Sequence, residues 1–147
     1  MELVHEMTLT VGLDPKQQMV GAGPGGTRIV ASATGGQLVG ERVNGTVAGA
    51  GADWVLVGAD GFGRLDVRLQ VETDDGAVLY ISYGGLLQLT EAFTTPGAET
   101  QFDDQYFRST PVFETGDERY AWLTTSVFVG RGRKLSDGVE YEIFRVT

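Results

Sequence analysis

RLDVRLQVET, at residues 64–73, carries the clearest periodic pattern in the chain. Apolar side chains occupy every second position, at Leu65, Val67, Leu69 and Val71, and the positions between them are polar or charged. Successive side chains of a β-strand point to opposite faces of the sheet. The segment therefore predicts a strand with one buried apolar face and one solvated face.

Short apolar runs separated by glycine continue along the rest of the chain. Glycine accounts for 22 of the 147 residues, and its placement between β-branched and aromatic runs favours tight turns. The pairs Gly35-Gly36, Asp60-Gly61 and Asp75-Gly76 can supply the positive φ angles of two-residue hairpins. We expect about ten strands, at residues 3–11, 27–33, 37–43, 46–48, 53–57, 63–73, 77–83, 106–114, 119–129 and 139–146.

Two other segments are predicted to lack strand structure. LLQLTEAF, at residues 86–93, predicts a short helical piece inside an irregular stretch at residues 84–105. Connections of that length usually cover a site or form an interface arm, and a disordered insertion is the alternative. The GAGPGGT run at residues 21–27 lacks the spacing, the lysine and the following helix of a phosphate-binding loop, so we read it as an ordinary loop.

An all-β chain of this length fits one domain with its own core. Antiparallel strands leave unpaired edges unless the sheet closes on itself. We therefore expect a single antiparallel β-barrel domain over residues 1–147, with a flattened sandwich as the alternative.

Charge and composition exclude several kinds of partner. The chain carries 11 Lys and Arg against 20 Asp and Glu, and a net charge of -9 would repel a phosphate backbone, so we expect no nucleic-acid partner. No apolar run approaches the roughly 20 residues of a membrane-spanning helix, and we expect no membrane partner. The first residues lack the basic and apolar segments of a secretory signal, which together with the missing cysteines predicts a cytoplasmic protein.

Few residues of the chain could bind a transition metal or form a serine triad. The chain has no cysteine, and His5 is its one histidine. A transition-metal site would need more such ligands, and a serine triad would have to recruit His5 without a GxSxG turn. We expect no metal and no cofactor.

Four segments together resemble a known family: GGQLVGERVNGTVAGAGADW (residues 35–54), DGFGRLDVR (60–68), TDDGAVLYI (73–81) and FRSTPVFETGDERYAWL (107–123). In order and spacing the chain resembles the domain-of-unknown-function 3237 family, also called uncharacterised protein family 0311. The resemblance implies a small antiparallel barrel, calycin-like or allene-oxide-cyclase-like in outline, that forms a homo-oligomer. The chain departs from the family pattern at Thr124, where asparagine is usual.

The resemblance also implies a candidate site. Its members are the motif residues Asp53, Trp54, Asp66, Arg68, Tyr80, Arg108, Glu114 and Trp122. A small barrel that holds a ligand needs apolar walls with a few converging polar groups. Trp54, Tyr80 and Trp122 could form such walls, with ordinary core packing as the alternative for the tryptophans.

The spacing of two charged residues adds an independent expectation. Arg108 and Glu114 lie six residues apart, so a regular strand points both to one face, although Pro111 between them can introduce a bend. If that face is the interior, the two would pair, and Glu114 could hold a raised pKa suited to proton transfer. A solvated strand face or a structural ion pair is the alternative.

Three functions fit these residues. The first is a cofactor-free isomerase, cyclase or lyase acting on a small, partly hydrophobic carbonyl compound. In it Glu114 or Asp53 moves a proton, while the arginines and Tyr80 stabilise an oxyanion. The second is a non-catalytic small-molecule binding protein, and the third is an oligomeric scaffold with a filled barrel. For Asp53 the alternative to a catalytic role is that it only caps a turn at Gly51. We favour the enzyme.

Overall fold

A computed structural model describes residues 1–147, and its ten strands form one antiparallel sheet. The strands are β1 (Leu3–Leu13), β2 (Gln18–Gly23), β3 (Gly26–Gly40), β4 (Asn44–Val57), β5 (Phe62–Thr73), β6 (Val78–Gln88), β7 (Phe107–Ser109), β8 (Val112–Glu114), β9 (Val127–Leu135) and β10 (Gly138–Val146). The remaining elements are the short helices α1 (Glu91–Thr94) and α2 (Ala121–Thr124) and the 3-10 turn η1 (Glu118–Tyr120).

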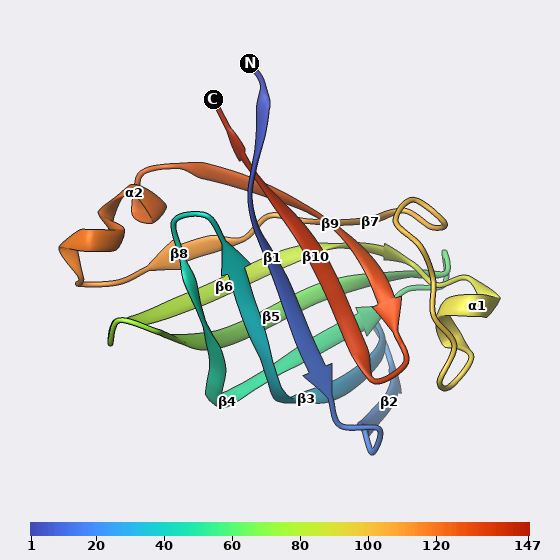
Figure 1. The fold of residues 1–147 in the computed structure, drawn as a ribbon. Coiled ribbons are helices and arrows are strands. Elements are labelled where there is room, and N and C mark those ends of the chain that lie inside the picture. Colours follow the sequence, from blue (N-terminus) through green and yellow to red (C-terminus); the bar gives the residue numbers. More distant parts are fainter.

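The sheet closes into a barrel of eight strand positions, which confirms the predicted fold. β1 pairs with β10 on one side and with β3 on the other, and that second pairing joins the two ends of the sheet. β7 and β8 follow one another along β6 and share one position of the barrel. β2 lies outside the closed ring, paired with β3. Figure 1 shows the curved sheet with α1 and α2 at opposite ends.

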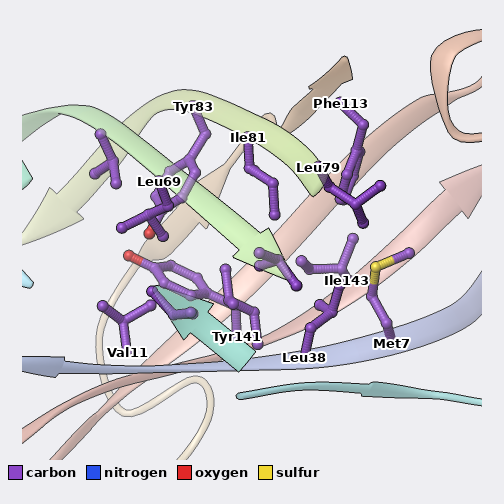
Figure 2. Packing of buried hydrophobic residues seen from close by; sticks show 14 of the residues in the cluster. Met7, Val11, Leu38, Leu69, Leu79, Ile81, Tyr83, Phe113, Tyr141 and Ile143 are labelled. Atoms are coloured by element: carbon purple, nitrogen blue, oxygen red, sulfur yellow. The ribbon is translucent and has the colours of Figure 1, made fainter. Parts of the chain in front are cut away.

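The predicted alternation of β5 is confirmed. Leu65, Val67, Leu69 and Val71 are buried inside the barrel, and most of the residues between them are exposed. The interior is a continuous apolar cluster of 23 buried residues drawn from strands all round the barrel. Figure 2 shows 14 of these side chains packed against one another between the strands.

The predicted hairpin at Gly35-Gly36 is wrong. Both glycines lie within the continuous strand β3, with φ of +147° and +146°, where the pairing register shifts between Ser32 and Gln37. A Cβ at Gly36 would collide with the carbonyl of Thr10 on β1, so the pair permits a bulge and a close strand crossing. The two short strands that we expected at residues 46–48 and 53–57 form one strand, β4, whose pairing register with β5 shifts between Ala48 and Ala52.

The two Asp-Gly turn predictions are confirmed, whereas three predicted segments differ from the structure. Asp60-Gly61 and Asp75-Gly76 do form turns, with φ of +79° at Gly61 and +94° at Gly76. The strand expected over residues 119–129 begins instead with η1 and α2, and β9 starts at Val127. β6 continues to Gln88, so the predicted helical piece shrinks to α1. The loop predicted at residues 21–27 is wrong for most of its length, because β2 ends at Gly23 and β3 begins at Gly26, and the two strands pair as a hairpin.

Residues 89–106, between β6 and β7, form what we call the covering loop, at the end of the barrel that carries α1 (Figure 1). Thr100 is buried, and its backbone N–H and its hydroxyl bond to the backbone of Lys134 on β9. The Lys134 ammonium donates to the carbonyls of Thr95 and Ala98. The loop is thus fixed against the barrel, at the end we call the mouth. The structure has no helix with the length and apolar character needed to cross a membrane.

Candidate functional site

Asp53 is a carboxyl group on the inner face of β4. Its register partners are Ala31 on β3 and Val67 on β5, both buried in the barrel, and paired residues share a face of the sheet. One carboxyl oxygen accepts a hydrogen bond from the backbone N–H of Asp66 at 3.0 Å. Asp53 lies within the strand and therefore caps no turn at Gly51.

Two buried tyrosines lie next to this carboxyl. Tyr83 on β6 is 6% exposed and pairs with Val67, which places it on the same inner row as Asp53. Tyr141 on β10 is 2% exposed, and its ring meets that of Tyr83 edge to face with centroids 5.2 Å apart. Figure 2 shows the two hydroxyl oxygens pointing toward one another. Three polar groups from β4, β6 and β10 thus meet inside an apolar barrel.

Burial changes the acidity of all three groups. Burial raises the pKa of Asp53 from 3.8 to about 6, and the hydrogen bond from the Asp66 N–H offsets only part of that rise. Burial also raises the pKa of Tyr83, and that of Tyr141 well above its ordinary value of 10.0. Near neutral pH Asp53 can both accept and release a proton, and the tyrosines remain protonated donors.

Arg108 and Glu114 share one face, as their even spacing predicts, but that face is the outside of the barrel. Phe107, Ser109 and Phe113 are buried, and the charged residues alternate with them. Arg108 pairs with Asp103 at 2.8 Å, and Glu114 is exposed. Aromatic side chains occupy the inner positions of β7 and β8. The expected interior pair of Arg108 and Glu114 is therefore not formed, and Arg108 pairs with Asp103 instead.

Other predicted site residues gather on the outer surface of β4, β5 and β6. A groove of about 460 Å³ is lined by Asp66, Arg68 and Tyr80, among others. Trp54 is 37% exposed, and the Arg68 guanidinium lies 5.8 Å from its ring centroid. Tyr80 is the register partner of Glu114 across the β6–β8 pairing. The expectation that Trp54 and Tyr80 wall an interior cavity is wrong, since both point outward.

Trp122 lies at the opposite end of the barrel, on α2. It packs against Phe128, and the Arg42 guanidinium stacks 3.5 Å from the centre of its ring. Arg42 also pairs with Glu6 at 2.9 Å, and Arg145 pairs with the same carboxylate at 2.8 Å. Burial alone would raise the pKa of Glu6, but the bonds from Arg145 and Arg42 lower it overall. This cluster joins α2 to the barrel and lies far from the mouth (Figure 1).

Sequence reasoning included Asp53 but missed three residues of the barrel interior. Tyr83 follows Leu79 and Ile81 at the same alternate positions, and Tyr141 lies between Val139 and Ile143 in the same way. That alternation could have found both tyrosines. Gln105 lies in a segment that we read as irregular, and no periodic signal marked it as buried.

Comparison with known proteins finds a family model and relatives that match most of the chain. The family model described as "Protein of unknown function (DUF3237)" matches residues 1–146. A UPF0311 protein of Rhodopseudomonas palustris strain TIE-1 is 31% identical over 125 residues, which cover 82% of this chain and 81% of that protein.

Solved structures share the barrel over almost the whole chain. A conserved protein of unknown function from R. palustris superposes with a TM-score of 0.88 at 28% identity, over 99% of this chain and 97% of that one. A β-barrel-like protein from Acinetobacter baumannii AYE gives 0.86 at 29% identity, over 99% and 96%. A protein from Penicillium herquei, described as an enzyme, gives 0.76 at 20% identity, over 99% and 94%, and shares the fold.

Proposed function

This chain belongs to the DUF3237 family, and we propose that it is a cofactor-independent acid–base enzyme acting on a small, partly apolar carbonyl compound in the mouth of its barrel. The observation that carries this proposal is Asp53, a carboxyl on the inner wall whose pKa is raised to about 6. Acids and bases that work near neutral pH need a pKa near that pH. Our assignment of the proton transfer therefore moves from the exposed Glu114 to Asp53.

The proposed step is proton abstraction next to a carbonyl. The Asp53 carboxylate takes a proton from the adjacent carbon, and the electron pair of the broken C–H bond moves toward the carbonyl oxygen. Tyr83 and Tyr141 donate hydrogen bonds to the resulting enolate oxygen. Returning the proton to another carbon gives an isomer, and expelling a leaving group from the next carbon gives an alkene. Neither outcome needs an oxidant or a reductant.

Deuterium exchange tests this step without knowledge of the natural substrate. Phenylacetone in D₂O exchanges its α-hydrogens once a base removes them, and proton NMR follows the signal loss. We expect the wild-type protein to accelerate exchange, with a rate that rises with pH through a midpoint of about 6 as the carboxylate forms. Asp53→Asn should return the rate to background. Equal rates for the two proteins would remove Asp53 from the mechanism.

The outer groove supports a second candidate function, binding of a small molecule without turnover. Its volume of about 460 Å³ suits a small ligand, and Arg68 could pair with an anionic group there. Arg68→Ala would then weaken binding of benzoate measured by titration calorimetry, while leaving phenylacetone exchange unchanged. Unchanged benzoate binding would remove this candidate.

A further inference from the structure

Gln105, the last residue but one of the covering loop, is a buried amide without a partner. It is 3% exposed, and neither its Oε1 nor its Nε2 has a hydrogen-bond partner in the protein. These two atoms are the buried side-chain polar atoms of the structure that lack one. Buried polar groups are nearly always bonded, so an unpaired amide calls for a partner that the chain itself does not supply, such as water, an ion or a ligand.

The backbone around Gln105 directs this amide into the mouth. Tyr106 still follows β6: its carbonyl accepts from the N–H of Gln88 at 2.8 Å, and its N–H donates to the Gln88 side chain at 3.2 Å. Tyr106 itself is exposed and Phe107 is buried inside the barrel. In an extended segment residues two apart share a face, so Gln105 faces inward with Phe107.

Phe107, two residues from Gln105 on the same inward face, belongs to an aromatic cluster. The Phe107 ring packs edge to face against Phe93 of the covering loop at 5.6 Å and against Tyr141 at 5.2 Å. The loop is held over this group by Thr100 and Lys134. Gln105 therefore shares its inward face with Phe107, a member of this aromatic cluster. Asp53, on β4, belongs to a different wall of the same interior.

We propose that Gln105 anchors a ligand in the barrel mouth, and that the ligand offers it a neutral edge with one hydrogen-bond donor and one acceptor, as in a carboxamide or a lactam. The Gln105 oxygen can only accept and its nitrogen can only donate, so such an edge satisfies both atoms at once. A carboxylate would leave the oxygen unpaired. The aromatic rings favour a flat apolar body attached to that edge.

This inference deepens the proposed function, because it names the substrate class of the Asp53 site. It rests on the proposed function only for the claim that the bound molecule reacts. Benzamide separates the two questions, since it carries the amide edge and a phenyl ring but no exchangeable C–H next to its carbonyl. Phenylacetone has the exchangeable hydrogens and lacks the amide.

The experiment measures benzamide binding by ligand-observed NMR titration to wild type, Gln105→Met and Gln101→Met. Gln101 is an exposed glutamine in the same loop and serves as the matched control. We expect Gln105→Met to weaken benzamide binding by roughly tenfold or more, and Gln101→Met to leave it within about twofold. Ethylbenzene, which has no polar edge, should bind all three proteins equally. Gln105→Met should also keep or raise the urea midpoint of unfolding, because an apolar side chain of similar shape removes the unpaired amide.

A measurement on the wild type guards against a variant that does not fold. The side-chain N–H resonances of Gln105 should shift when benzamide is added and stay in place with ethylbenzene. Absence of benzamide binding, equal binding by wild type and Gln105→Met, or unmoved Gln105 resonances would each overturn the inference. If Gln105→Met loses benzamide while Asp53→Asn leaves phenylacetone exchange unchanged, the subsite stands and the proposed reaction fails.

Discussion

Replacing Asp53 by asparagine should stabilise the protein at neutral pH and change its stability little near pH 4. The pKa of Asp53 is about 6 in the folded state and 3.8 as an ordinary carboxyl, a difference of about two pKa units. Between those values the folded protein keeps a proton that the unfolded chain has released, so stability falls as pH rises from 3.8 to 6 and is level above. At 1.36 kcal/mol per unit, the ionised carboxyl costs up to about 3 kcal/mol.

The asparagine amide keeps the shape of the side chain and its acceptor for the Asp66 N–H, and it carries no charge to bury. The free energy of unfolding of the variant should therefore exceed that of the wild type by about 3 kcal/mol above pH 7 and by less than about 1 kcal/mol at pH 4. Urea unfolding at several pH values, followed by tryptophan fluorescence, gives both free energies.

Glu114→Gln is the matched control, because it neutralises a carboxylate on the exposed outer face. Its effect should stay within about 0.5 kcal/mol at every pH. A gap between Asp53→Asn and wild type that does not change with pH would refute the reasoning, since it would mean that burial does not hold the proton on Asp53. A destabilised Asp53→Asn at pH 8 would refute it as well.

Two further predictions concern other groups of the structure. Tyr83→Phe should slow phenylacetone exchange by roughly 100-fold while changing the free energy of unfolding by less than about 1 kcal/mol, because it removes one hydrogen-bond donor and keeps the ring; an unchanged rate would exclude Tyr83 as an oxyanion donor. Glu6→Gln should lower stability at pH 7 by about 2 kcal/mol, because it breaks the pairs with Arg42 and Arg145. The pKa of Glu6 is lowered from 4.5, so its contribution is present above that value and is lost as pH falls below it; a deficit of equal size at pH 3 and pH 7 would contradict the ion-pair explanation.

The barrel could be predicted from the sequence because the periodic signal is local. Leu65 to Val71 alternate cleanly, and the Asp-Gly turns at residues 60–61 and 75–76 need only their own backbone conformation. The hairpin predicted at Gly35-Gly36 was wrong because positive φ angles occur in bulges as well as in hairpin turns. Only the contact with Thr10 on β1, far away in the sequence, decides between the two.

The site was harder to predict because an even spacing shows that two residues share a face of a strand but does not show whether that face is inside the barrel. Arg108 and Glu114 do share a face, but Phe107 and Phe113 have the larger apolar area and occupy the interior. Asp53 was a candidate on sequence alone, yet its raised pKa depends on burial by strands remote in sequence. The unpartnered state of Gln105 depends on how the covering loop folds back over the mouth.

The central claim is that Asp53 is a buried acid–base group in the barrel, and its own titration tests that claim most directly. Carbon-13 NMR of the Asp53 side-chain carboxyl, assigned by comparison with Asp53→Asn, follows its protonation in the wild-type protein. The structure predicts a midpoint of about 6. A midpoint at or below the ordinary value of 3.8 would mean that the carboxyl is solvated, and it would contradict the proposed mechanism.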